Sequence, residues 1–144
     1  MMYFTNSIMK MIDVCNKMHL MTTIENISSI INNAIIQQII CKDIETGIQS
    51  CSYVNKFVTD LKIVVERNDE VCGDTCIDIK NIDYLIDNIS MYKQSLNKIR
   101  ECLDNNDTSH AISYMKSLDT CADLITVNTI DIFNDLGLET EGVF

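Results

Sequence analysis

The stretch of the sequence that decides the fold is IDYLIDNISMYKQSLNKIRECL, residues 82–103. Apolar side chains recur in it at alternating steps of three and four residues, which is the pattern of a helix that packs along one stripe. The members of this a/d seam are Ile82, Leu85, Ile89, Tyr92, Leu96, Ile99 and Leu103. An uninterrupted seam of three heptads predicts an amphipathic helix over about residues 79–104.

Four further segments have helical periodicity, and the rest of the fold follows from where they end. They cover about residues 5–20, 23–46, 50–68 and 109–136. The chain contains no proline and only four glycines. Because glycine weakens a helix interior and is favoured just after a helix end, Gly47 and Gly137 are expected to end helices.

The helix starts are predicted from side chains that can accept hydrogen bonds from free backbone N–H groups. Thr22 and Glu25 have the spacing of a capping box at the start of the second segment. Thr108 or Ser109 is expected to cap the last segment. A β-branched and polar run at 126–129 allows a kink or break near 127–129 in that segment.

The segments are joined by connections of two to about ten residues, which favour antiparallel neighbours. The sequence therefore predicts an all-α fold, an antiparallel helical bundle of four long helices plus a short N-terminal helix. It predicts one domain over 1–144, with the short helix in 1–21 and a loose tail at 138–144. A chain of 144 residues, 47% of them hydrophobic, is large enough to bury a sizeable core.

The formal net charge of −10 restricts the partners that the sequence suggests. A nucleic-acid backbone and an anionic membrane surface both require a basic face, so neither is expected. Acidity permits a basic protein partner, although it also serves solubility alone. Because Lys10, Asp13 and Lys17 interrupt the apolar N-terminal region, we expect neither a signal peptide nor a membrane span. The sequence thus predicts a cytoplasmic protein.

The segment VCGDTC, residues 71–76, has the strongest resemblance to a site motif. A structural zinc site needs four ligands, usually as two close pairs, and Cys72 with Cys76 gives only one. An EF-hand reading puts Ile79 where a bidentate glutamate is needed. The surrounding acids disfavour a thiolate nucleophile. We interpret the segment as a turn and expect no metal or cofactor, while a disulfide in an oxidising compartment stays open.

Catalytic groups are sparse, since the only histidines are His19 and His110. Cys121 with His110 is a conceivable nucleophile and base, but no local signature supports it. The single step from Asp107 to His110 is far short of the ligand set of a di-iron bundle. No glycine-rich phosphate loop or nucleophile elbow occurs. We therefore expect a protein that is not an enzyme.

The composition is distinctive: Ile is the commonest residue, Asn and Asp follow, Pro and Trp are absent, and Arg occurs twice. With its helical pattern, the chain resembles small intracellular all-α proteins of poxviruses. Several of these have a Bcl-2-like fold and block host apoptotic or inflammatory signalling by binding other proteins. The resemblance implies a binding role in the host cytoplasm. No Asn-Trp-Gly-Arg-like segment or all-apolar central helix occurs, so the simple up-and-down bundle is the preferred prediction and the Bcl-2-like fold is the alternative.

Two principal hypotheses for function remain. The first is a protein–protein interaction module whose partner is basic or presents an amphipathic helix. Its candidate surface combines the seam residues of 82–103 with a methionine face of Met9, Met11 and Met18. The second is a self-associating structural or assembly protein, such as a homodimer, that uses the seam of 82–103 between chains. A thiol-dependent activity at Cys72 and Cys76 and an acidic mimic of nucleic acid are further alternatives.

Overall fold

The computed structural model describes residues 2–22, 33–68 and 79–135, which form four helices. They are α1 (Met2–Thr22), α3 (Ala34–Asn68), α4 (Ile79–Asp104) and α5 (Thr108–Asp135). No strand occurs in these ranges. The all-α prediction is confirmed. The N-terminal helix is longer than expected, with 21 residues.

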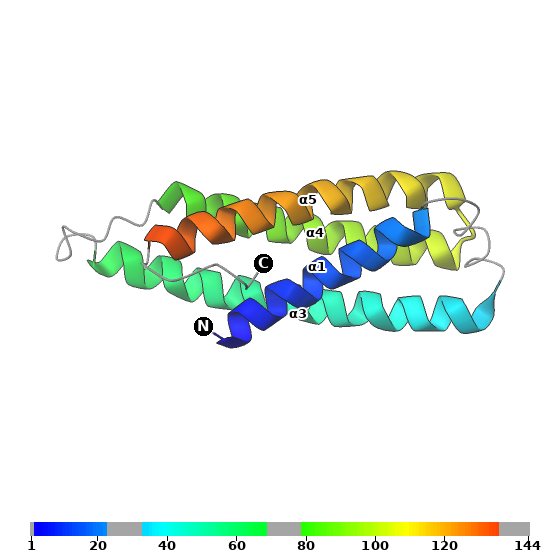
Figure 1. Ribbon diagram of the computed structural model, residues 1–144, viewed down its shortest axis with the longest axis horizontal. Helices are drawn as coiled ribbons and strands as arrows, with labels where there is room; N and C mark the ends of the chain where they lie inside the picture. Colours follow the sequence, from blue (N-terminus) through cyan, green and yellow to red (C-terminus); the bar gives the residue numbers. More distant parts are fainter. Residues whose placement is uncertain (1, 23–32, 69–78, 136–144) are drawn as a thin grey trace.

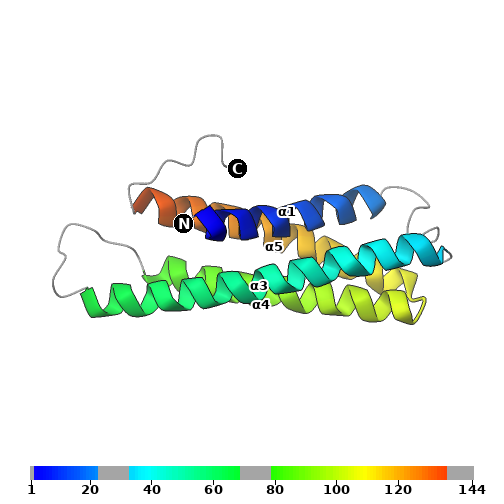
Figure 2. The same cartoon turned by 90° about the horizontal axis from the view of Figure 1, so that it is seen from below.

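The four helices run alternately up and down along one long axis (Figure 1). In this view α4 lies beside α5 and α1 beside α3, and the view from below pairs α1 with α5 and α3 with α4 (Figure 2). The same four pairs make the tertiary contacts. Each helix therefore has two antiparallel neighbours, as predicted, and no described helix is enclosed on all sides.

The core lies between the inner faces of all four helices. The seam of α4 is at its centre, and every one of its seven side chains is buried. α1 contributes Ile8, Met11, Val14, Cys15 and Met18 to the same cluster. The Tyr92 hydroxyl donates a hydrogen bond to the backbone carbonyl of Met11, which ties the centre of α4 to α1 across the bundle.

Gly47 does not end a helix, because α3 continues through it from Ala34 to Asn68. The two helices expected over 23–46 and 50–68 are therefore one within the described residues. Gly47 is buried, and a Cβ at this position would lie 2.9 Å from Leu96 Cδ1 and 3.5 Å from a Val14 methyl. The glycine is thus needed where α3 passes close to α4 and α1, and this packing offsets its helix penalty of about 1 kcal/mol.

The helix caps differ from those predicted. Asn33 caps α3, since its Oδ1 accepts hydrogen bonds from the backbone N–H groups of Ile35 (3.1 Å) and Ile36 (3.3 Å). Thr22 is the last residue of α1, and Glu25, its partner in the predicted capping box, lies outside the described residues. Asp107 caps α5 by accepting from the backbone N–H of His110 at 3.3 Å, so neither Thr108 nor Ser109 has that role.

α4 ends in a Schellman motif. Asn106 has a φ of 56°, a left-handed conformation that Asn tolerates better than most residues. The N–H of Asp107 donates to the carbonyl of Cys102 at 2.8 Å, and the N–H of Asn106 donates to that of Leu103 at 3.4 Å. This tight turn places α5 directly beside α4.

The expected break near 127–129 does not occur, since α5 is continuous from Thr108 to Asp135. The hydroxyls of Thr126 and Thr129 donate to backbone carbonyls four residues earlier, at 3.0 and 2.7 Å. These hydroxyls are therefore satisfied within the helix, and α5 continues through them without a break. The predicted turn at 71–76 and the predicted tail at 138–144 lie outside the described residues.

Candidate interaction surface

The seam of α4 is not available as a surface. Its seven members are each 0% exposed within a single chain. The other three helices fill the space around them, so a second chain would reach them only if the bundle opened. This corrects both uses of these residues in the sequence interpretation, as an interaction surface and as an interchain seam. They are Ile82, Leu85, Ile89, Tyr92, Leu96, Ile99 and Leu103.

The predicted methionine face divides between core and surface. Met11 and Met18 are buried in the core, which corrects their assignment to an exposed face. Met9 is 46% exposed and lines a shallow groove of about 690 Å³ between α1 and α3. Tyr53 lines it from α3, and the remaining lining residues are polar or charged. Of the ten residues predicted from the sequence, only Met9 lies on the surface.

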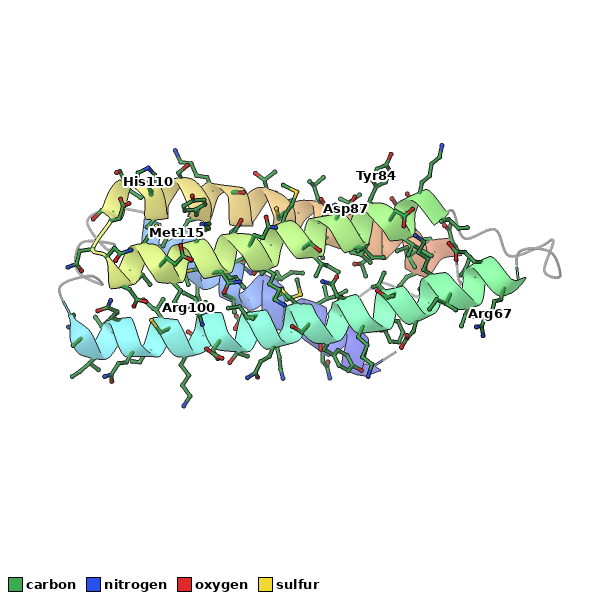
Figure 3. All side chains as sticks on the ribbon, turned by 180° about the vertical axis from the view of Figure 1, so that it is seen from behind. Arg67, Tyr84, Asp87, Arg100, His110 and Met115 are labelled. Atoms are coloured by element: carbon green, nitrogen blue, oxygen red, sulfur yellow. The ribbon has the colours of Figure 1, made fainter. Side chains whose placement is uncertain are left out.

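A second group of exposed apolar residues lies along α4 and α5. Tyr84 and Met91 of α4 and Leu124 and Val127 of α5 each expose between 46% and 56% of their side chains. Tyr84 projects from an early turn of α4, near Asp87 (Figure 3). We call these four apolar residues, together with Asp87 and Asp131, the α4/α5 face.

Two hydrogen bonds across the junction fix the register of the helices beneath this face. The Asn88 amide donates to Asn128 Oδ1 at 2.8 Å, and the Ser95 hydroxyl donates to that of Ser117 at 3.4 Å. Because the helices are antiparallel, Met91 and the stretch of α5 around Leu124 lie between these two bonds. The exposed apolar residues of the two helices therefore line one junction, and we call them the apolar strip.

The charges around the strip are mostly acidic. α5 has four aspartates and one lysine, whereas α3 and α4 each balance four acidic residues with four basic ones. Several acidic side chains on the α3/α4 side are neutralised, for example Asp83 by Lys62 at 2.7 Å. Among the described residues, Asp87 and Asp131 form no ion pair, although Asp87 lies within electrostatic range of Lys62. These carboxylates are thus open to positive groups from outside.

The described thiols are poorly suited to nucleophilic chemistry. Burial raises the pKa of Cys15 and of Cys51 to about 12, and nearby Asp119 adds to the effect at Cys15, whose Sγ lies 3.6 Å from its carboxylate. Burial also raises the pKa of Cys121. These thiols therefore remain protonated near neutral pH.

His110 does not complete a catalytic pair with Cys121. The two residues are eleven positions apart on the continuous helix α5, which separates them by roughly 16 Å along its axis. The imidazole Nδ1 of His110 instead lies 2.6 Å from Asp107 Oδ2 at the exposed start of α5 (Figure 3). Its partner Asp107 already serves as the helix cap, so this pair has a structural explanation.

In the described part of the chain, no three side chains of His, Cys, Asp or Glu come together in a way that would hold a metal ion. Cys72 and Cys76 lie outside that part. None of the described helices is both long enough and apolar enough to cross a membrane.

Comparison of the chain with family models, with curated proteins and with solved structures finds no match. The site must therefore be argued from its own geometry. Sequence reasoning missed Tyr84, Met91, Leu124 and Val127. A signal for two of them was present, because Tyr84, Met91 and Lys98 repeat every seven residues along a second line of α4.

Proposed function

We propose that this protein is a non-enzymatic interaction module that binds a basic amphipathic helix of a partner protein on its α4/α5 face. The single observation that carries the proposal is the exposed apolar strip beside the unpaired carboxylates Asp87 and Asp131 on that face. A helix that presents apolar residues flanked by Lys or Arg complements both features.

Other functions have less support from the described residues. The thiols there have raised pKa values, and His110 is engaged with the helix cap of α5. Self-association through the seam of 82–103 is not proposed, because those side chains are enclosed by their own chain. The groove at Met9 and Tyr53 is lined mainly by polar or charged residues, among them Lys10 and Asp13.

A designed helical peptide tests the proposal. The probe is an 18-residue amphipathic helix with Leu at helical spacing and Lys on both flanks, and the matched control carries Glu in place of Lys. We expect the Lys peptide to bind the full chain and to shift the NMR signals of Leu124 and Val127. Because unlike charges attract and salt screens them, binding should weaken as salt rises, and the Glu peptide should bind much more weakly.

Paired variants locate the binding surface. The double variant Leu124→Ser/Val127→Ser removes two exposed apolar side chains and should weaken peptide binding about tenfold or more. Ile39→Ser, which changes an equally exposed residue on α3, is the control and should leave affinity unchanged. Equal affinity for both peptides, or no loss in the double variant, would contradict the proposal.

The resemblance to poxvirus proteins suggests where such binding would act. A modulator of host signalling or apoptosis in the host cytoplasm would act by such binding, and that role stays a prediction. It is tested by expressing the chain in cells given an apoptotic stimulus, with Leu124→Ser/Val127→Ser as the control. If cells that express the unchanged chain survive no better than cells that express this variant, the anti-apoptotic role is contradicted.

A further inference from the structure

A pocket of about 320 Å³ opens on the α4/α5 junction, next to Met91. This volume is at the lower end of the range for small-molecule sites, so the pocket suits one large side chain better than a cofactor. It lies on the same junction as the apolar strip, toward the C-terminal half of α4. Its lining consists of Met91, Gln94, Ser95, Asn97, Lys98, Tyr114 and Ser117.

The pocket exists because small residues meet where α4 and α5 pack. Ser95 and Ser117 face one another, and a larger side chain at either position would occupy the space. Their hydroxyls share a hydrogen bond of 3.4 Å. Since this bond engages both hydroxyls, the pocket does not require a polar guest to satisfy them.

Gln94 and Asn97 are polar, but the other three wall residues, Met91, Lys98 and Tyr114, favour an aromatic guest. The thioether of Met91 makes favourable contacts with ring edges. The ring of Tyr114 can pack edge-to-face or offset against a second ring. The ammonium group of Lys98 lies at the rim, 3.5 Å from Glu101, where it can approach the face of a guest ring.

We infer that this pocket is the anchor subsite of the α4/α5 face and that it takes an aromatic side chain from the docked helix. The partner in this inference is the one named under the proposed function, and the pocket itself can be tested without it. Asp87 and Tyr84 precede Met91 by one and two helical turns. The basic residues of the partner therefore lie on one side of its aromatic anchor, which sets the direction of docking.

Indole is the first probe, with cyclohexanol as a non-aromatic control of similar size. Titration of indole into the full chain should produce saturable NMR shifts of the Met91 methyl and the Tyr114 ring. Cyclohexanol should bind at least several-fold more weakly. An absence of saturable shifts with indole, or equal binding of cyclohexanol, would overturn the inference.

Two leucine variants of α5 test whether indole binds in this pocket. Ser117→Leu fills the pocket and should abolish the indole response. Ser113→Leu, one turn earlier at an exposed position, should retain it. Far-UV circular dichroism establishes that each variant is folded. If Ser117→Leu is folded and still binds indole, the pocket assignment is wrong.

A peptide comparison separates this inference from the proposed function. A Trp anchor in the Lys peptide should bind several-fold more tightly than a Leu anchor, and Met91→Ala should remove that preference. If both peptides bind equally well, the face is retained and the aromatic anchor is refuted. If indole binds but neither peptide does, the pocket stands and the proposed partner is refuted. Concentration-dependent shifts without any probe would assign the pocket to a second copy and overturn the inference.

Discussion

Helix α4 has two lines of residues with heptad spacing. The other helices bury one line and leave the other exposed to solvent. The inner line is the seam from Ile82 to Leu103, whose seven side chains are fully buried. The outer line is Tyr84, Met91 and Lys98, of which the first two are more than half exposed. The spacing of a pattern thus identifies a helix face, but the neighbouring helices decide whether that face becomes core or surface.

The largest expected effect tests this contrast directly. Ile89→Ala on the inner line removes buried methyl and methylene groups and leaves a cavity, so it should lower the free energy of unfolding by about 2–5 kcal/mol. Met91→Ala, two residues away on the outer line, should change it by only about 0.5 kcal/mol or less. Urea unfolding followed by circular dichroism measures both values. Similar losses for the two variants would mean that the outer line is covered in solution.

The buried thiols around Tyr92 provide the second prediction. The pKa of Cys15 and of Cys51 is raised from 9.0 to about 12 by burial. In the unfolded chain these thiols ionise near pH 9, while in the folded chain they stay neutral. Their contribution to stability is therefore complete below about pH 9 and is lost as the pH rises toward 12.

At pH 10 this loss should be about 1 kcal/mol for each of the two thiols, relative to pH 8. Urea unfolding at the two pH values measures it. Cys51→Ala should reduce the pH dependence by about half of this sum. Cys41→Ala, at a half-buried position where the pKa is raised less, should reduce it by a smaller amount. The same slope in Cys51→Ala as in the unchanged chain would show that this thiol does not contribute.

The inner line was predictable because strong periodicity determines a helix and its buried face together. The helix expected over about 79–104 is present as Ile79–Asp104, and its seam is buried. The prediction that Gly47 ends a helix was wrong because it used local sequence alone. Its role depends on Leu96 and Val14, which are distant in sequence, and local propensity contains no information about such a close approach.

Gly47 also gives the third prediction, which concerns how closely the inner line is packed. Gly47→Ala gains helix propensity of about 1 kcal/mol, but the new methyl group would lie 2.9 Å from Leu96 Cδ1. Since Leu96 is fully buried and has little room to move, overpacking of about 1–3 kcal/mol should outweigh that gain. We expect a net loss of about 1 kcal/mol in thermal or urea unfolding.

A second substitution distinguishes a clash from other causes. Leu96→Val shortens the side chain that the new methyl group meets, so Gly47→Ala should cost less in that background than in the unchanged chain. An equal cost in both backgrounds would exclude contact with Leu96 as the reason. A gain in stability from Gly47→Ala alone would show that the core yields to the methyl group.

The candidate site was much harder to predict than the fold. On the outer side of α4 the polar residues Asp87 and Asn88 lie between Tyr84 and Met91, so the outer line has no apolar neighbours that would mark it as a contact face. Leu124 lies on the same helix as a much stronger buried pattern. The face becomes visible only when α4 and α5 are placed side by side, because half of its residues come from each helix.

The smallest expected effect concerns the hydrogen bond that lies between the two lines. Asn88 and Asn128 are half-buried and joined at 2.8 Å, so each single change to Ala removes one partner of a shielded bond. A double-mutant cycle should give a coupling energy of about 0.5–1.5 kcal/mol, the usual net value of such a bond. The measurement also bears on the α4/α5 face, because this bond sets the register that aligns Met91 with Leu124. A coupling near zero would mean that another contact sets the register, and the alignment of the apolar strip would then need a separate explanation.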